Sequence, residues 1–137
     1  MTPEFKVILN DNITGRKIED LRVVIGWDRM GGKYEQIIKK AYTRYSVRDG
    51  TKLIGYLSVI SDGIADAFLV DLMVNPEYQG KEIGKQMVTR AILDLKEEGI
   101  KCIQVIFNPE LESFYKQFGF HILKAGIIDN DTMKLTF

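Results

Sequence analysis

The chain has little of several residue types, and each scarcity excludes a class of protein. Its only cysteine, Cys102, cannot support a disulfide framework, and we expect this side chain to be buried in its apolar stretch. Histidine, cysteine and carboxylates nowhere cluster at metal-ligand spacing, so no metal site is predicted. No apolar run reaches the ~18 residues that span a bilayer. The first residues also lack a secretory signal pattern, and the predicted location is cytoplasmic.

The chain also has no excess of charge of one sign, because 19 Lys and Arg residues balance 19 Asp and Glu residues. Nucleic acids and anionic membranes attract proteins with a basic excess, so neither is expected as a partner. The 137 residues, of which 45% are hydrophobic, suit a soluble chain with one core. We predict a single domain over residues 1–137.

Hydrophobic periodicity and turn signals predict an α/β fold. Asp49-Gly50 marks a tight turn between antiparallel strands, and the apolar run 67–74 predicts a central strand covered on both faces. The expected architecture is a mixed, mostly antiparallel twisted sheet flanked by helices. Its predicted strands are 5–9, 44–48, 53–60, 67–74 and 101–107, its helices 18–25, 34–42, 83–98 and 110–118, with a terminal hairpin of 120–125 and 133–137.

Residues 74–85 carry the most informative local pattern, in which a buried strand leads through Gly80 and Gly84 into the longest predicted helix. Backbone N–H groups of such a loop and of the first helical turn lack partners within the helix. They lie at the positive end of the helix dipole and form a ready anion site. Lys81 and Lys85 add positive charge there. An ordinary strand–loop–helix joint, where glycine only relieves the turn, is the alternative.

This segment resembles motif A of the GNAT superfamily, Gln/Arg-x-x-Gly-x-Gly/Ala, which binds the pyrophosphate of acetyl-CoA. Gln79 matches the first position and Gly84 the last, whereas Glu82 stands where the family usually has its first glycine. A carboxylate there repels a pyrophosphate unless it turns away or pairs with a lysine. The resemblance implies that the strand before the loop also lines the pantetheine, in an acyl-CoA cleft between strands 4 and 5. The implied cofactor-binding residues are Leu72, Met73, Val74, Gln79, Gly80, Lys81, Glu82, Ile83, Gly84 and Lys85.

Residues 108–120 resemble motif B of the same family, with Asn108 after the fifth strand and a Phe-Tyr-x-x-x-Gly-Phe ending. The resemblance implies that Asn108 contacts the pantetheine and that Tyr115 contacts the cofactor and protonates the departing CoA thiolate. A phenol with a pKa of ~10 is protonated at neutral pH and can act as a general acid. The alternatives are packing for Tyr115 and a turn cap for Asn108.

Asp71 and Trp27 are the candidates on the substrate side. Strand alternation puts Asp71 on one face with Leu69 and Met73. A carboxylate among apolar neighbours either serves a site, where it attracts an ammonium group or takes its proton, or ties the strand to a loop. The indole of Trp27 either packs on the acceptor or belongs to the core. Asp-Leu-Met-Val resembles the strand of GNAT members that acetylate small amines, including plant-type serotonin N-acetyltransferases.

The resemblance, together with these features, implies an acetyl-CoA-dependent N-acetyltransferase that transfers the acetyl group directly to a primary amine in a ternary complex. A small-molecule amine is the expected acceptor, and a homodimer is compatible with the sequence. Two alternatives stay open: an enzyme that acetylates protein lysines or N-termini, and a regulator that binds acetyl-CoA without turnover.

Overall fold

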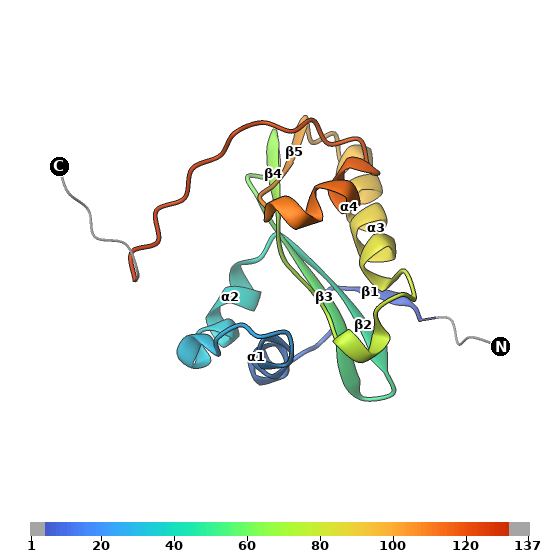
Figure 1. Ribbon diagram of the computed structural model, residues 1–137, viewed down its shortest axis with the longest axis vertical. Coiled ribbons are helices and arrows are strands. Elements are labelled where there is room, and N and C mark those ends of the chain that lie inside the picture. Colours follow the sequence, from blue (N-terminus) through green and yellow to red (C-terminus); the bar gives the residue numbers. More distant parts are fainter. Residues whose placement is uncertain (1–4, 132–137) are drawn as a thin grey trace. The chain divides into compact units, whose positions relative to one another are not determined.

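The five strands of the computed structural model form one sheet in the order β1-β2-β3-β4-β5 (Figure 1). The structure describes residues 5–131. Neighbouring strands are antiparallel from β1 to β4, and β4 and β5 are parallel. This confirms the predicted mixed, mostly antiparallel sheet. The strands are β1 (Val7–Leu9), β2 (Thr43–Asp49), β3 (Lys52–Ser61), β4 (Asp66–Val74) and β5 (Cys102–Val105).

The chain divides after Val105 into two compact units. In the first unit, α1 (Gly15–Val24) and α2 (Tyr34–Lys40) cover one face of the sheet, with the short 3-10 helix η1 (Met30–Gly32) between them (Figure 1). Helix α1 begins after Thr14, whose side chain accepts a hydrogen bond from Lys17 N at 3.3 Å. The core on this face consists of Ile13, Ile18, Leu21, Tyr34, Leu53, Tyr56 and Met73.

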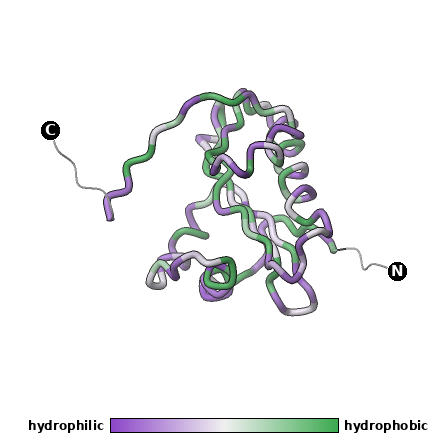
Figure 2. The backbone as a smooth tube through the Cα atoms, in the orientation of Figure 1, coloured by the Kyte–Doolittle hydropathy of each residue, from purple (hydrophilic) through white to green (hydrophobic). Residues whose placement is uncertain are grey.

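Helix α3 (Ile83–Glu97) covers the opposite face. Gly55 and Tyr56 are adjacent on β3 and therefore point to opposite faces. A Cβ on Gly55 would lie 3.0 Å from Ile83 Cγ2 and 3.1 Å from Met87 Cε, so α3 packs closely against this strand. Hydrophobic and hydrophilic positions alternate along α3 (Figure 2), as the predicted apolar stripe requires. The short 3-10 helix η2 (Pro76–Tyr78) precedes the loop that enters α3.

The second unit contains the 3-10 helix η3 (Pro109–Leu111) and α4 (Glu112–Lys116). Residues 120–129 have no regular secondary structure, so the strand predicted at 120–125 is wrong. A strand needs a hydrogen-bonded neighbour, and the predicted partner strand, 133–137, lies outside the described residues.

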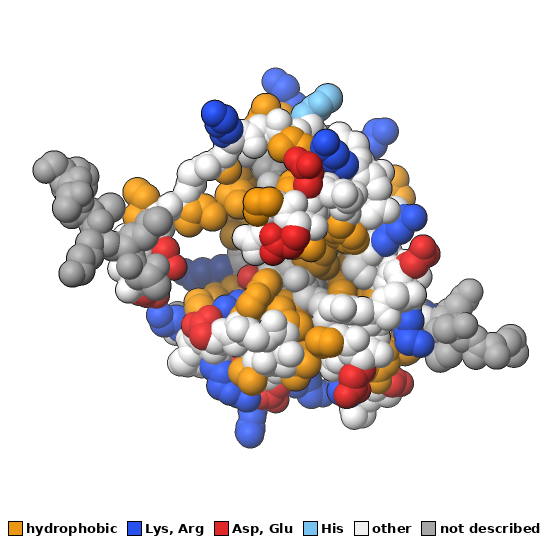
Figure 3. All heavy atoms as spheres, viewed as in Figure 1, with side chains coloured by type: hydrophobic (Ala, Val, Ile, Leu, Met, Phe, Trp, Pro, Cys, Tyr) orange, Lys and Arg blue, Asp and Glu red, His pale blue; other side chains and the backbone are white. Residues whose placement is uncertain are grey.

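Two further findings concern the surface. Cys102 is exposed, which contradicts the predicted burial, because it is the first residue of the edge strand β5. Acidic and basic side chains are interspersed on the face drawn in Figure 3, in keeping with their equal numbers. None of the helices within residues 5–131 has the length and apolar content to cross a bilayer.

The contact between Gly15 and the start of α2 yields a prediction about stability. Gly15 N donates a hydrogen bond to Glu35 Oε1 at 2.7 Å, and a Cβ on Gly15 would lie 2.5 Å from Glu35 N. Gly15→Ala should therefore lower the free energy of unfolding by ~1–3 kcal/mol, measured by urea denaturation. Gly126→Ala is the control, because a Cβ there meets nothing within 4 Å. Equal stability of the two variants would contradict the close helix contact.

Candidate active site

Strand β4 loses one of its two neighbours partway along its length. Pairing with β5 runs from Asp66↔Cys102 to Leu69↔Val105, where β5 ends. Beyond that point β4 continues to Val74 beside β3 alone. Main-chain groups of residues 70–74 on this side therefore lack a strand partner within the first unit. This open edge lies where the family resemblance implies an acyl-CoA cleft between strands 4 and 5, and it carries the candidates Leu72, Met73 and Val74.

A β-bulge interrupts β4 at the start of this open edge. The pairs Tyr56↔Met73 and Ser58↔Val70 leave a single β3 residue opposite two residues of β4, Asp71 and Leu72. Asp71 has a φ of 58°, in the left-handed region that residues other than glycine avoid.

The bulge overturns the predicted alternation of β4. Leu69 pairs with Val59, whereas Met73 pairs with Tyr56, an odd number of positions away on β3. Leu69 and Met73 therefore point to opposite faces, and the prediction that both share a face with Asp71 is wrong. The extra residue shifts the phase of all side chains beyond it. The Met73 side chain is 1% exposed in the core and Met73 pairs with Tyr56 of β3, so its side chain is not available at the open edge.

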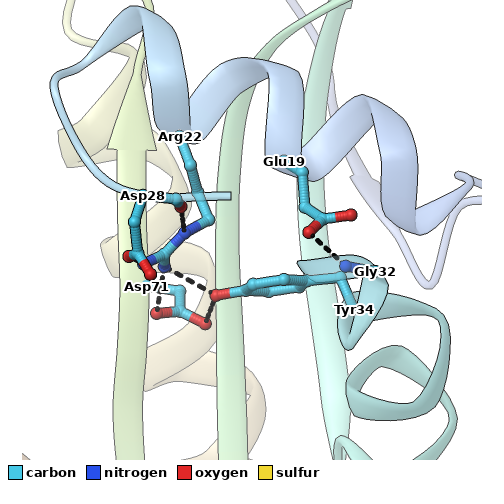
Figure 4. A network of polar contacts seen from close by, with 6 residues as sticks. All are labelled: Glu19, Arg22, Asp28, Gly32, Tyr34 and Asp71. Carbon is cyan, nitrogen blue, oxygen red and sulfur yellow. Dashed lines mark hydrogen bonds and ion pairs between the residues drawn. The ribbon is translucent and has the colours of Figure 1, made fainter. Parts of the chain in front are cut away.

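Asp71 points toward α1 and α2, where Tyr34 and Arg22 meet it (Figure 4). The Tyr34 hydroxyl donates to Asp71 Oδ2 at 2.7 Å, and Arg22 Nη1 lies 3.7 Å from Asp71 Oδ1. Arg22 Nη1 also donates to the Tyr34 hydroxyl at 2.8 Å. Burial and the bond to Asp71 raise the pKa of Tyr34 well above its ordinary value, so this hydroxyl stays protonated and donates.

The loop after α1 brings Trp27 and Asp28 to the same place. Arg22 donates from Nε to Asp28 O at 2.6 Å and from Nη2 to Asp28 Oδ1 at 2.8 Å. The hydrogen bond from Arg22 lowers the pKa of Asp28. The Trp27 ring centroid is 5.1 Å from Arg22 Cζ, and Trp27 is 41% exposed. Trp27 therefore does not belong to the core, and it shares a cluster with Asp71 through the guanidinium between them.

Glu19 and Gly32 fix the far side of this loop. Glu19 Oε1 accepts a hydrogen bond from Gly32 N at 2.8 Å (Figure 4). The Arg22 side chain is 10% exposed, and the Asp71 side chain is 24% exposed. The cluster therefore consists of a nearly buried cation and carboxylates that solvent still reaches.

The loop before α3 provides main-chain donors at a helix N-terminus. Gly80 has a φ of 80° and Glu82, the N-cap of α3, has a φ of 61°. Gln86 N donates to Glu82 O at 2.9 Å, so the N–H groups of residues 83–85 precede the first bond of the helix. A Cβ on Gly80 would meet nothing within 4 Å, which leaves this side of the loop open. The buried Ile83 side chain belongs to the core, so only its main chain is available there.

The conformation of Glu82 explains the departure from the motif. A left-handed residue is most easily glycine, so the site favours glycine for backbone reasons as well as electrostatic ones. Glu82 is exposed and makes no ion pair within residues 5–131, with Lys81 and Lys85 included. No ion pair with a described residue therefore offsets the Glu82 carboxylate beside the helix N-terminus.

Tyr115 and Asn108 lie in the second unit. Tyr115 is 5% exposed, and its ring stacks on that of Phe107 with centroids 4.7 Å apart. Burial raises the pKa of Tyr115, which keeps the phenol protonated at neutral pH. Asn108 O accepts a hydrogen bond from Leu111 N at 2.9 Å, and its side chain makes no cap hydrogen bond to η3.

The sequence reasoning did not single out Arg22 or Tyr34. One signal was available, because Arg22 follows Ile18 by four residues and so lies on the apolar stripe of its helix. A charged residue on a buried face requires a partner.

Comparisons with known proteins agree with this arrangement. Residues 41–122 match the family model of the acetyltransferase (GNAT) domain. An uncharacterized N-acetyltransferase, ycf52, from Pyropia yezoensis is 30% identical over 125 residues, which are 85% of this chain and 72% of that protein.

Solved structures show the same fold. A GNAT family acetyltransferase from Streptococcus pneumoniae superposes with a TM-score of 0.79 at 24% identity, covering 95% of this chain and 100% of that one. The PaiA N-acetyltransferase from Thermoplasma acidophilum, in complex with coenzyme A, gives 0.67 at 20% identity, covering 88% and 93%. The matched family model covers more than half of this chain, from before β2 to beyond α4, and the chain therefore belongs to the GNAT family of acetyltransferases.

Proposed function

We propose that this acyltransferase moves the acetyl group of acetyl-CoA to the primary amine of a small molecule, by direct transfer in a ternary complex. The observation that carries the proposal is the open edge of β4 followed by the left-handed loop that enters α3. Main-chain donors at residues 80–85 suit a pyrophosphate, and Lys81 and Lys85 add positive charge. The main chain along Leu72, Met73 and Val74, on the side of β4 that faces away from β3, suits the amides of a pantetheine arm, and Gln79 stands at the entrance of the loop.

The cluster around Arg22 supports an amine as the acceptor. One guanidinium faces two carboxylates, Asp28 and Asp71, so the ionised groups sum to a charge of −1. Such a site attracts an ammonium group, and the exposed ring of Trp27 offers an apolar and cation-binding surface beside it. We place the acceptor on the Asp71 and Trp27 side on this basis.

In the proposed reaction the neutral amine attacks the thioester carbonyl, the carbon–sulfur bond breaks, and the nitrogen releases its extra proton to water as the amide forms. A main-chain N–H near Leu72 polarises the carbonyl oxygen, and Tyr115 gives its proton to the leaving thiolate. Tyr115 regains a proton from water, so the protons balance. Asn108 contributes its side-chain amide to the pantetheine. Positioning supplies much of the rate acceleration, so few side chains take part in the chemistry.

The primary experiment is thermal unfolding with CoA, followed by thiol release with a panel of amines. CoA at ~100 times its dissociation constant should add about 2.7 kcal/mol to the free energy of unfolding. Arylalkylamines and aliphatic amines should be turned over faster than lysine peptides. Absence of a shift at millimolar CoA would overturn the proposal. Preference for peptides would indicate that the acceptor is a protein and not a small molecule. CoA binding without turnover would indicate a regulator.

A second prediction separates the charge of Glu82 from its backbone strain. Glu82→Gly and Glu82→Ala both remove the carboxylate, so both should bind CoA more tightly, by an amount that shrinks as salt rises. Only glycine relieves the left-handed conformation, and Glu82→Gly should be more stable than Glu82→Ala by ~1 kcal/mol. Calorimetry and urea denaturation measure the two effects. Unchanged CoA affinity in both variants would place the carboxylate away from the ligand.

A third prediction concerns Tyr115. Tyr115→Phe keeps the ring that stacks on Phe107 and should lower turnover by ~10²–10⁴-fold with CoA affinity preserved. The exposed Tyr42, whose hydroxyl donates to Glu98 Oε2 at 2.9 Å, provides the control variant Tyr42→Phe. Wild-type turnover in Tyr115→Phe, measured where chemistry limits the rate, would reduce Tyr115 to a packing residue.

A further inference from the structure

Three elements meet at the bulge of β4, each through one side chain. Arg22 comes from α1, Tyr34 is the first residue of α2, and Asp71 is the left-handed residue of the bulge (Figure 4). The Asp71 side chain is engaged at both oxygens, by the Tyr34 hydroxyl at Oδ2 and by Arg22 Nη1 facing Oδ1. We infer that Tyr34 and Arg22 are positioning residues that hold this bulge, and that Asp71 serves acetyl transfer by fixing the β4 main chain rather than as the base. The inference rests on the proposed function.

The two positioning residues are themselves held in place. Tyr34 is 2% exposed within the core, and its neighbour Glu35 is bonded to Gly15 at the start of α1. Arg22 is held by its two hydrogen bonds to Asp28. A hydrogen bond from a fixed hydroxyl to a carboxylate is among the stronger kinds in proteins. Asp71 is therefore tied to a rigid support, which maintains a backbone conformation that it would otherwise avoid.

The bulge determines what the open edge of β4 presents. If Asp71 left the left-handed region and β4 paired regularly with β3, residues 72–74 would shift by one position. Met73 would then leave the core, and the main-chain donors and acceptors of this edge would change places. The clamp formed by Arg22, Tyr34 and Asp71 thus selects the N–H groups that face the cofactor and the thioester.

Protein groups orient both Asp71 oxygens toward α1 and α2, because Oδ2 accepts the Tyr34 hydrogen bond and Oδ1 faces the Arg22 guanidinium. The charged and titratable groups facing Asp71 are Arg22 from α1, Tyr34 from α2 and Tyr56 from β3, with Asp28 behind Arg22. Burial raises the pKa of Tyr56 to about 12, and that of Tyr34 is raised further. Neither tyrosine titrates near neutrality, so neither takes the ammonium proton, and we assign that proton to water.

The test compares Tyr34→Phe with Tyr45→Phe, a matched control on the other side of the sheet. Tyr45 is 1% exposed, and its hydroxyl donates to Asp94 Oδ2 at 2.8 Å. Each change removes one buried hydroxyl bonded to a carboxylate, so both should lose stability. Tyr34→Phe should in addition weaken CoA binding by ~10-fold in calorimetry and lower kcat by ~10–100-fold, because a small misplacement of bound groups is costly. Tyr45→Phe should keep both values near wild type.

Variants of Asp71 separate the clamp from a base. Asn tolerates the left-handed region and keeps an oxygen for the Tyr34 hydroxyl, so Asp71→Asn should lower kcat only ~3-fold. Asp71→Ala keeps neither property and should lower kcat ~100-fold. In a plot of kcat/KM against pH, the fall in rate on the acidic side should persist in Asp71→Asn. Equal loss in both variants, with disappearance of that fall, would identify Asp71 as the base and overturn the inference.

The CoA measurement also separates this inference from the proposed function. A wild type that binds CoA but acetylates no amine would refute the proposed function, while weaker CoA binding by Tyr34→Phe alone would still support the clamp. Equal CoA affinity in Tyr34→Phe, Tyr45→Phe and wild type would overturn the clamp. A wild type without affinity for CoA would overturn both.

Discussion

A parallel pair of strands can be hydrogen-bonded only as far as both strands run, and here β5 stops at Val105 while β4 continues to Val74. A buried, unpaired strand edge is costly unless something else satisfies its amides. The features of the first unit that bear on function lie at the two ends of this edge. The bulge at Asp71 precedes it, and the loop with Gly80 and Glu82 follows it. Both features are set by backbone conformation, so the site consists largely of main chain.

The second determinant is the nearly buried guanidinium of Arg22. A charge in such a place requires partners, and Arg22 has carboxylates at Asp28 and Asp71 and aromatic rings at Trp27 and Tyr34. These partners come from a loop, a helix and a strand. The same residue therefore organises the loop after α1 and joins it to β4, which connects packing to the place where we propose that the acceptor binds.

The sequence predicted what depends on local pattern. Helix α3 begins at Ile83 as expected, because its apolar stripe and the glycines before it are local signals. The sequence marks Asp71 as unusual but does not predict the bulge, since an aspartate in a strand does not reveal a positive φ. It marks Glu82 as an electrostatic anomaly, whereas the left-handed backbone is evident only in the structure. The roles of Arg22 and Tyr34 depend on contacts between distant segments, which periodicity does not encode.

The bulge also changes how substitutions along β4 should be read. Before Asp71, odd-numbered residues such as Ala67 and Leu69 face α3, whereas after it Met73 faces α1 and α2, and Val74 pairs with Gly55 on the α3 side. Odd-numbered side chains of β4 therefore point to one face of the sheet before Asp71 and to the opposite face after it. Related sequences aligned across this point keep each side chain on the same face of the sheet only if the extra residue is kept. A single deletion there would exchange the α1 and α2 face with the α3 face for residues 72–74, without altering any residue type.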